Sequence, residues 1–268
     1  MKKVVVVIPV YNDQAGLELS LQSLLPEKDL FDVLVLDDGS TVPADISKFP
    51  ELSIHLERLA VNTKLTGALN RSLLYAQEKG YAYIARLDAG DRAINGRFRK
   101  QIDYLDSHPD ISVLGSWVYF ITSTTGQVRE VIHPHTWQEL KKMMHYACYV
   151  YHPAVMMRTE ATTRAGTYDA RFFPADDYEY WLRMLDMGMK IELYPEILIE
   201  YIRTLESLGA KQGREQLKAA LRVKLKHFDF FTMWSYLGIV NSLEDLYPRL
   251  FPIRGLKRLA KKLIGFRF

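Results

Sequence analysis

Cysteine and long apolar segments are scarce in this sequence. The one cysteine, Cys148, excludes an intrachain disulfide and is typical of a protein from a reducing compartment. The apolar run at residues 4–9 is too short for an export signal, and the longest later stretch, residues 230–240, falls short of the about 18 residues that a spanning helix needs. The sequence therefore predicts a cytoplasmic protein.

Acidic side chains are missing from residues 249–268. The same segment holds seven basic ones: Arg249, Arg254, Lys257, Arg258, Lys261, Lys262 and Arg267. Without them the chain has 28 basic and 32 acidic residues, so the remainder carries a net charge of −4. Nucleic acid is not expected as a partner, because this acidic remainder offers no second basic surface.

The spacing of apolar residues in this tail predicts a helix over residues 256–264. Leu256, Leu259, Ala260, Leu263 and Ile264 fall on one side, opposite the lysines and arginines. A basic amphipathic helix of this kind binds an anionic membrane surface, which predicts a peripheral location on the cytoplasmic face of the inner membrane. The alternative is a helix that packs its apolar stripe on the main domain.

Strand and helix patterns alternate along the first 201 residues. Short apolar runs predict strands at residues 4–10, 32–36, 54–56 and 81–87, and amphipathic spacing predicts helices at 14–25, 66–78 and 97–107. This order predicts an α/β fold with a Rossmann-like, doubly wound and mostly parallel sheet. Residues 155–157 and 190–194 are predicted strands, and residues 177–187 a helix.

The domain boundary is expected near residue 201. Residues 1–201 would form the main domain, with a binding half at roughly 1–115 and a second half at roughly 116–201. Residues 202–268 change in character to helical segments, beginning with residues 212–226, and form a helical C-terminal extension.

Two clusters of carboxylates follow predicted strands. The first is Asp37-Asp38-Gly39-Ser40-Thr41 and the second is Asp88-Ala89-Gly90-Asp91. Open α/β sheets bind ligands beyond the carboxyl ends of such strands, and gathered acids are costly unless a cation or hydrogen-bond donors meet them. The second cluster would suit a divalent metal carrying a nucleotide diphosphate, and the first a nucleoside.

Several classes with similar architecture are excluded by missing loops. Pro9-Val10-Tyr11-Asn12 stands where a dinucleotide-binding enzyme has Gly-x-Gly-x-x-Gly after its first strand. A phosphate-binding P-loop and the glycine-rich basic loop of sugar nucleotidyltransferases are also absent from the sequence.

A series of motifs, in order, resembles the family 2 glycosyltransferases with the GT-A fold over roughly residues 3–201. The motifs are Val7-Ile8-Pro9-Val10-Tyr11-Asn12, Asp37-Asp38-Gly39-Ser40-Thr41, Asn62 with Ala68-Leu69-Asn70, Ile84 through Asp91, His152-Pro153-Ala154-Val155-Met156, Gly166-Thr167-Tyr168-Asp169 and Asp176 through Trp181. The resemblance implies transfer of a sugar from a nucleotide diphosphate donor with inversion at the anomeric centre.

The resemblance implies a nucleotide-sugar site at the strand ends, in the donor half at roughly residues 1–115, and an acceptor side at roughly residues 116–201. Pro9 and Tyr11 would form a wall for the base and ribose, and Asp38 would accept hydrogen bonds from the base. Taken alone, the sequence Asp-Asp-Gly-Ser around Asp38 would also suit a plain turn. Arg86 would contact phosphate or counter the acidic cluster. The remaining members of this expected site are Asn70 and Asp88.

The resemblance also implies a metal site at Asp88 and Asp91, with Mn²⁺ or Mg²⁺ as the cofactor. Such hard cations take oxygen ligands and neutralise charge on a departing diphosphate. The family pattern is Asp-x-Asp-Asp, and its second aspartate, a common direct ligand, is Gly90 in this chain.

Asp177 is expected to be the general base. The family has an acidic pair that opens a helix near the acceptor, and its second member takes the proton of the acceptor hydroxyl. That pair is Asp176-Asp177 here. General-base help of this kind accelerates transfer by about 10²–10⁴-fold. Capping of the helix N-terminus is the alternative role, and one residue can serve both.

The expected function is transfer of a single sugar to a hydroxyl of a glycan or lipid-linked acceptor, in cell-surface polysaccharide or lipopolysaccharide assembly. Processive synthases of the same family generally carry spanning helices and a Gln-x-x-Arg-Trp motif, which this sequence lacks. The alternative is a catalytically silent scaffold that binds nucleotide sugars; Gly90 suggests it, and the presence of Asp88 and Asp177 opposes it.

Four further side chains carry weaker expectations. Trp181 and Cys148 are predicted to be buried, and His152 is either structural or part of a cleft. Lys64 stands where family members often have glycine.

Overall fold

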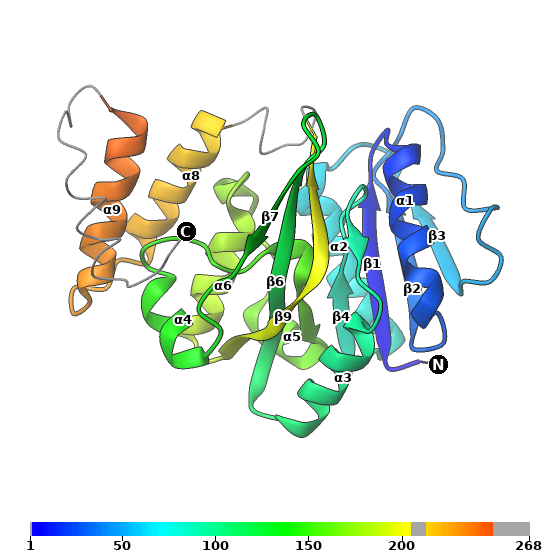
Figure 1. Ribbon diagram of the computed structural model, residues 1–268, viewed down its shortest axis with the longest axis horizontal. Coiled ribbons are helices and arrows are strands. Elements are labelled where there is room, and N and C mark those ends of the chain that lie inside the picture. Colours follow the sequence, from blue (N-terminus) through cyan, green and yellow to red (C-terminus); the bar gives the residue numbers. More distant parts are fainter. Residues whose placement is uncertain (1, 205–212, 249–268) are drawn as a thin grey trace.

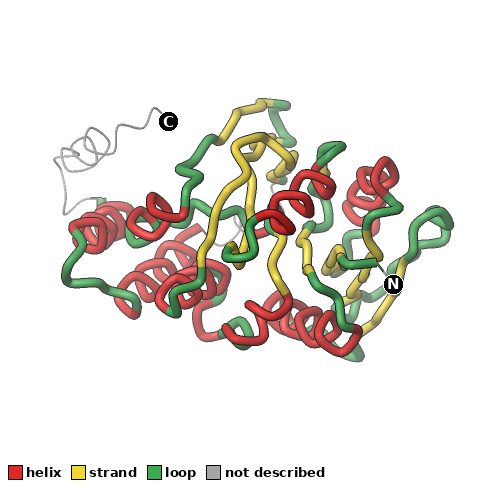
Figure 2. The backbone as a smooth tube through the Cα atoms, turned by 90° about the horizontal axis from the view of Figure 1, so that it is seen from below, coloured by secondary structure: helices red, strands yellow, loops and turns green. Residues whose placement is uncertain are grey.

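The computed structural model describes residues 2–204 and 213–248, which form a nine-stranded sheet between layers of helices (Figure 1). The main path of the sheet runs in the order β3-β2-β1-β4-β8-β6-β9-β5, and β7 pairs with β6. Figure 2 shows helices above and below the strands, the arrangement of a doubly wound fold. The α/β prediction is confirmed.

The N-terminal half of the sheet is parallel. It comprises β1 (Val4–Val10), β2 (Phe31–Asp37), β3 (Ile54–Arg58) and β4 (Tyr83–Arg86). All seven residues of β1 are buried, because helices cover both faces of a parallel sheet. The covering helices are α1 (Gln14–Leu24), α2 (Lys64–Lys79) and α3 (Arg97–Ser107), with a short 3₁₀ turn η1 (Leu25–Glu27) after α1.

The second half of the sheet is mixed. Strand β8 (Met156–Arg158) runs antiparallel to β4 and to β6 (Ile111–Thr122), whereas β9 (Lys190–Arg203) is parallel to β6. The two-residue strand β5 (Arg92–Ala93) is antiparallel to β9. The segment after β6 turns back as β7 (Gln127–Val131), so it forms a hairpin. Strand β9 is longer than the predicted residues 190–194 and continues past residue 201.

Helices of the second half pack beside these strands. They are α4 (Trp137–Met143), α5 (Thr159–Ala165) and α6 (Asp176–Asp186), with 3₁₀ turns η2 (His152–Ala154) and η3 (Ala170–Phe172). The C-terminal unit consists of α8 (Gly213–Lys226) and α9 (Met233–Leu246), which stand at the end of the molecule away from β3 (Figure 1). Helix α9 was not predicted from the sequence.

Burial agrees with one weaker expectation and contradicts another. Trp181 is fully buried in the core, as predicted, whereas Cys148 is exposed because it lies in the irregular segment after α4. Within residues 2–204 and 213–248, no helix is both long and apolar enough to cross a membrane. The helix predicted at residues 256–264 lies outside the described residues.

Candidate active site

The first carboxylate cluster forms a tight turn at the carboxyl end of β2. Asp37 is fully buried, accepts hydrogen bonds from the backbone N–H groups of Ser40 and Ala44, and lies 3.6 Å from the Arg58 guanidinium. Burial raises the pKa of Asp37, but the hydrogen bonds from Ser40 and Ala44 outweigh it, so the net pKa is lowered. Asp37 therefore stays ionised and fixes the turn that carries Asp38.

Asp38 is buried and held by the start of α2. Its Oδ1 accepts hydrogen bonds from the backbone N–H and the hydroxyl of Thr63, both at 2.7 Å. Next to Thr63, Lys64 has a φ of +62°, the left-handed region that glycine adopts most easily. The structure thus explains why glycine is usual at this position. The Lys64 side chain is exposed.

The two residues expected to form a wall for the base and ribose differ in exposure. Pro9 is buried in β1, where it pairs in register with Leu36 of β2. Tyr11 follows the end of β1 and is 51% exposed. Tyr11 is the one of the two whose ring is open to a ligand.

The first turns of α2 also hold the segment that leads into α6. Thr66 donates a hydrogen bond to Oδ2 of Asp176 at 2.6 Å. Asn70 makes two hydrogen bonds with the backbone of Tyr168: its Nδ2 donates to the carbonyl, and its Oδ1 accepts from the N–H. In this structure Asn70 therefore positions the loop before α6, and its predicted contact with the donor stays a prediction.

Arg86 and Asp88 form an ion pair at the end of β4. Arg86 is almost fully buried, pairs with Oδ1 of Asp88 and donates a hydrogen bond to the Val7 carbonyl. The Asp88 side chain remains 33% exposed. The loop that carries it is fixed to α1, because the Ser20 hydroxyl donates to the carbonyl of Asp88 and accepts from the N–H of Gly90.

Asp91 faces inward and is tied to β9. Its Oδ1 accepts a hydrogen bond from the backbone N–H of Ile202 at 2.8 Å, and its buried Oδ2 has no hydrogen-bond partner among the described residues. Burial, and then the charge of Asp88, raise the pKa of Asp91 well above its ordinary value. Asp91 therefore joins the donor half of the molecule to the long strand of the second half.

Few side chains in this region could act as ligands of a metal ion. Among the described residues no three His, Cys, Asp or Glu side chains form a group that could hold an ion. Asp88 offers an exposed carboxylate, and a Cβ placed on Gly90 would meet open space, so the position of the missing aspartate faces outward from the loop. This set fits Mg²⁺ or Mn²⁺ only in the common manner in which substrate phosphates and water complete the coordination.

Asp177 lies at the first turn of α6 and is partly exposed. Burial raises its pKa to about 7, and the negative charges of Asp176 and Asp88 act in the same direction. The electrostatic effect of Asp88 shows that the two carboxylates share one region. Because Asp176 is buried against Thr66, Asp177 is the member of the pair that is free to meet a substrate.

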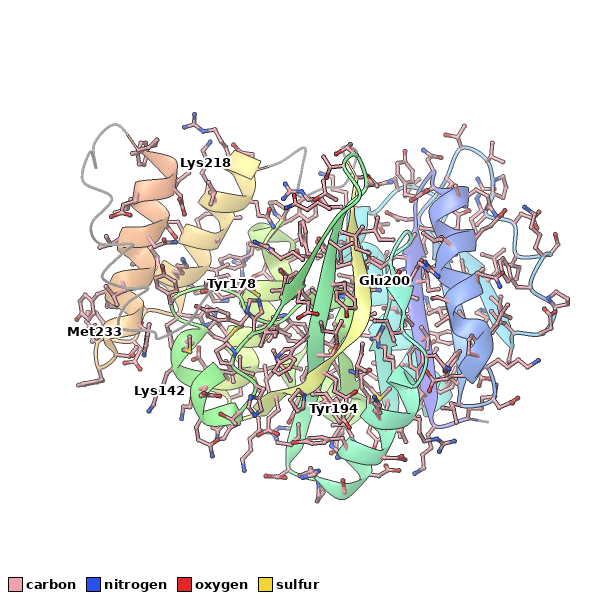
Figure 3. All side chains as sticks on the ribbon, viewed as in Figure 1. Lys142, Tyr178, Tyr194, Glu200, Lys218 and Met233 are labelled. Carbon is pink, nitrogen blue, oxygen red and sulfur yellow. The ribbon has the colours of Figure 1, made fainter. Side chains whose placement is uncertain are left out.

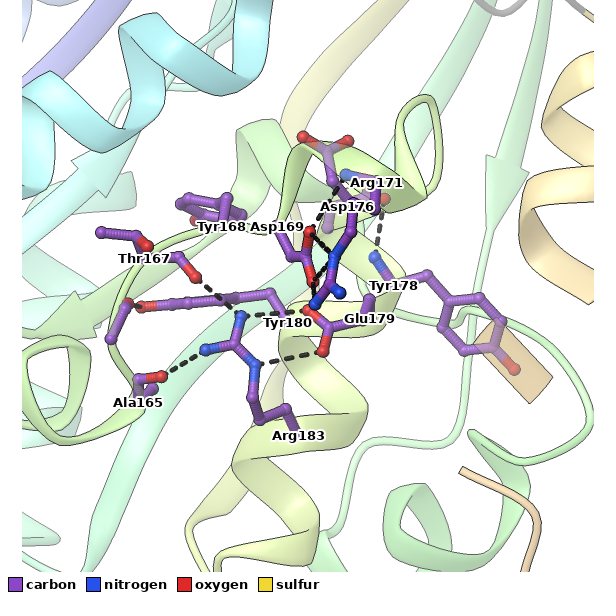
Figure 4. Close-up of polar contacts among 12 residues, drawn as sticks. Ala165, Thr167, Tyr168, Asp169, Arg171, Asp176, Tyr178, Glu179, Tyr180 and Arg183 are labelled. Carbon is purple, nitrogen blue, oxygen red and sulfur yellow. Dashed lines mark hydrogen bonds and ion pairs between the residues drawn. The ribbon is translucent and has the colours of Figure 1, made fainter. Parts of the chain in front are cut away.

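Helix α6 is anchored by a buried carboxylate in its first turn. Glu179 binds Arg183 through both carboxylate oxygens, and Arg183 also donates to the carbonyls of Ala165 and Thr167 (Figure 4). Lys226 of α8 donates to Glu179 Oε1 at 2.5 Å. The C-terminal unit is thereby bonded to the helix that carries Asp177.

An aromatic group that the sequence did not indicate includes Tyr201, the residue before Ile202, whose backbone N–H binds Asp91. Tyr151 and Tyr201 have ring centroids 5.3 Å apart, and His133 stacks on Tyr151 at 5.7 Å. Burial, and then the charges of Asp91 and Asp88, raise the pKa of Tyr201, and Asp177 adds to this effect. The group therefore borders the same region. Its signal in the sequence is weak, because the three residues come from separate segments.

His152 is a structural residue. Its ring is buried and its Nε2 lies 3.0 Å from the Tyr168 hydroxyl. Burial lowers the pKa of His152 well below its ordinary value, so the ring is neutral. Burial and this contact favour the structural alternative that the sequence left open.

Comparison with known proteins agrees with this geometry. The family model described as "Glycosyl transferase family 2" matches residues 5–166. An uncharacterized glycosyltransferase of Methanocaldococcus jannaschii is 28% identical over 94% of this chain and 93% of its own length. The amylovoran biosynthesis glycosyltransferase AmsE of Erwinia amylovora is 25% identical, over 96% and 97%.

A third relative has a named reaction. The UDP-Gal:alpha-D-GlcNAc-diphosphoundecaprenol beta-1,3-galactosyltransferase of Escherichia coli is 24% identical over 96% of this chain and 92% of its own length. Each relative is therefore similar along nearly the whole chain.

Two solved structures share the fold. S. aureus TarS in complex with UDP-GlcNAc has a TM-score of 0.67 at 15% identity and covers 95% of this chain and 76% of its own. The mannosyltransferase PcManGT of Pyrobaculum calidifontis, in complex with GDP-Man and Mn²⁺, has a TM-score of 0.64 at 17% identity, over 92% and 70%. Because the family model spans more than half of the chain, the protein belongs to glycosyl transferase family 2 and is a glycosyltransferase.

Proposed function

We propose that the protein is an inverting glycosyltransferase that moves a single sugar from a nucleotide diphosphate donor to a hydroxyl of a lipid-linked acceptor or growing glycan. The observation that carries this proposal is the position of Asp177, a partly exposed carboxylate with a pKa of about 7 in the same region as Asp88. A base poised near neutral pH suits proton removal from a sugar hydroxyl. Relatives named for amylovoran biosynthesis and for a diphosphoundecaprenol acceptor support cell-surface polysaccharide assembly.

The donor nucleotide would lie across the ends of β1 and β2. Tyr11 would provide an exposed ring beside the base, and Pro9, buried in β1, would form the rest of the wall. Thr63 orients Asp38 by occupying its Oδ1, which leaves Oδ2 to accept a hydrogen bond from a base N–H. Arg86 orients the carboxylate of Asp88 in the same way on the diphosphate side.

Asp88, with Asp91 behind it, would hold a divalent cation together with the diphosphate. The cation supplies charge neutralisation on the departing nucleotide. The side chains of this chain do the remaining work: Arg86 holds Asp88 in place, and Asp91 fixes the loop to β9 through Ile202.

Asp177 would then take the proton of the acceptor hydroxyl as that oxygen attacks the anomeric carbon. The new carbon–oxygen bond forms on the face opposite the bond that breaks, so the diphosphate leaves with the bonding electrons and the anomeric centre inverts. The rings of Tyr151 and Tyr201 border this region, where they would stack against the acceptor sugar.

The proposed location is the cytoplasmic face of the inner membrane. The basic segment 249–268, outside the described residues, would attract anionic lipids through its seven positive charges. Such attachment would bring the active site close to a lipid-linked acceptor.

A panel of nucleotide sugars tests the function directly. The donor, added at about 100 times its Kd, is expected to stabilise the folded protein by about 2.7 kcal/mol and to raise the melting temperature by several degrees. Nucleosides without the diphosphate serve as the control and should shift the melting temperature less. A panel in which no nucleotide sugar raises the melting temperature would refute the proposal.

Metal binding gives a second prediction, centred on Gly90. Mn²⁺ is expected to tighten binding of the nucleoside diphosphate, and Gly90→Asp is expected to tighten it by a further tenfold or more because it adds a carboxylate ligand. The new side chain has room, since a Cβ at Gly90 meets no atom within 4 Å, although its φ of +99° is strained for aspartate.

Calorimetry with metal and then with chelator measures both effects. Gly126→Asp is the matched control, because Gly126 also has a positive φ, of +67°, and open space, but lies in the β6–β7 turn. Equal affinity of the wild-type protein with metal and with chelator would mean that Gly90 marks loss of the ion.

A further inference from the structure

The turn between α8 and α9 exposes large apolar side chains. Phe231 is 100% exposed and Phe230 is 75% exposed. Met233 is 57% exposed and Tyr236 is 49% exposed. We call these four residues the aromatic tip. Isolated apolar residues on a surface are ordinary, but a contiguous group of this size marks an interaction site.

The aromatic tip is held in one conformation by its own polar groups. Asp229 accepts a hydrogen bond from the N–H of Phe231 at 2.8 Å, and the Ser235 hydroxyl accepts one from the N–H of Asp229 at 3.1 Å. The Tyr236 hydroxyl donates to the Phe230 carbonyl at 3.3 Å. The fold therefore presents Phe230 and Phe231 outward at a fixed turn, with the Phe230 ring against that of Phe228 at 5.0 Å between centroids.

The aromatic tip is small. Met233 lies at the outer edge of the C-terminal unit, at the left of the view, away from the sheet (Figure 3). A stable contact between two protein chains buries about 800 Å² on each partner, which is the area of some 20–30 residues. Four side chains at a turn are far fewer, whereas a few aromatic residues suffice for insertion at a membrane interface.

Positive charge lies on the same part of the molecule. The ring of Trp234 in α9 contacts that of Tyr146, 6.2 Å between centroids, so α9 packs against the segment that directly follows α4. The last turn of α4 carries Lys141 and Lys142, both exposed, and Lys142 lies toward the same lower left part of the view as Met233 (Figure 3). These charges would complement anionic headgroups beside the inserted rings.

We propose that the aromatic tip inserts into the interface of an anionic lipid bilayer and orients the enzyme on the membrane. This inference rests on the proposed lipid-linked acceptor and adds a second, apolar contact to the charge of the basic tail. Helix α8 is bonded to α6 through Lys226 and Glu179, so insertion of the tip would hold the helix that carries Asp177 at a fixed height above the bilayer.

The test is flotation of the full-length protein with vesicles of phosphatidylcholine containing 30% phosphatidylglycerol, at low and at high salt. Phe230→Ser/Phe231→Ser is expected to weaken binding at least tenfold at either salt concentration, because apolar insertion is insensitive to ionic screening. The matched control is Leu74→Ser/Val128→Ser, which removes two exposed apolar side chains on α2 and β7 and should bind like the wild type.

Two further readings make the result decisive. Equal flotation of the wild type and the Phe230/Phe231 variant would overturn the proposal. Light scattering without lipid gives the second reading. A dimeric wild type and a monomeric variant would also overturn the proposal, because the tip would then bind a second copy. The variant should keep the donor-induced melting shift and transfer to a water-soluble acceptor, which shows that its active site is intact. Absence of both in the wild type would count against the proposed function, whereas flotation and light scattering test the tip.

Discussion

Replacing Asp177 by asparagine is expected to lower kcat for sugar transfer by at least about 100-fold, with little change in affinity for the donor. Asparagine keeps the size and hydrogen bonding of the side chain but cannot accept the proton of the acceptor hydroxyl. Donor binding should persist, because Asp38 and Asp88 come from other elements. A variant that retained more than about a tenth of wild-type turnover would show that Asp177 is not the base.

The pH profile separates this loss from a structural effect. Because the pKa of Asp177 is raised to about 7, kcat of the wild type should rise as the pH increases through about 7 and then level off. A carboxyl group with a raised folded-state pKa lowers stability as the pH rises from its unfolded value near 4 to that point. The asparagine variant should therefore lack the rise of kcat near pH 7. Its melting temperature, compared with that of the wild type at the same pH, should increase between pH 4 and pH 8. Asp186→Asn, at the other end of α6, is the matched control and should keep wild-type kcat.

Replacing Glu179 by glutamine is expected to destabilise the protein by about 3 kcal/mol, since it breaks a buried ion pair. The Glu179 side chain is fully buried and meets Arg183, Lys226 and the ring of His227. Glutamine would leave Arg183 and Lys226 without the Glu179 counter-charge between α6 and α8. Denaturant unfolding measures the change, and a loss below about 1 kcal/mol would contradict it.

The pH dependence of this second effect has the opposite sign. Burial raises the pKa of Glu179, but the His227 ring 3.6 Å away and the hydrogen bonds from Arg183 and Lys226 outweigh it and lower the pKa to about 2. The stabilisation is therefore complete above the unfolded value near 4.3 and is lost as the pH falls toward 2. Wild type and variant should converge at low pH. Glu215→Gln, which breaks an exposed pair with Lys218, is the control and should cost less than about 1 kcal/mol.

Local patterns were enough to predict the N-terminal half of the fold. The unbroken apolar run of β1 and the leucines of α1 produce one buried strand and one buried helical face, and each pattern is complete within a dozen residues. The turn at Asp37 and Asp38 was predicted for the same reason, because its chemistry is contained in adjacent residues. The family resemblance added the order of the motifs and the proposed role of Asp177.

Contacts between distant segments could not be read from the sequence. The hydrogen bond from Ile202 to Asp91 spans 111 positions, and the length of β9 depends on its pairing with β6. Helix α9 was missed because its apolar residues do not fall on one face, and because its packing depends on Gly238, where an added Cβ would meet the His145 carbonyl at 2.3 Å. Tyr201 belongs to the site only once β9 has been placed beside the acidic loop.

The first turns of α2 have a consequence for engineering donor preference. Thr63 fixes Asp38 on the nucleotide side, and three residues later Thr66 fixes Asp176, the neighbour of the proposed base. A library that varied these positions to alter the accepted nucleotide would also displace α6, which carries the proposed base, so most of its members would lose turnover before they gained selectivity. Changes around Tyr151 and Tyr201 carry no such link to Asp38 within the described residues, which makes the proposed acceptor side the more evolvable half of this enzyme.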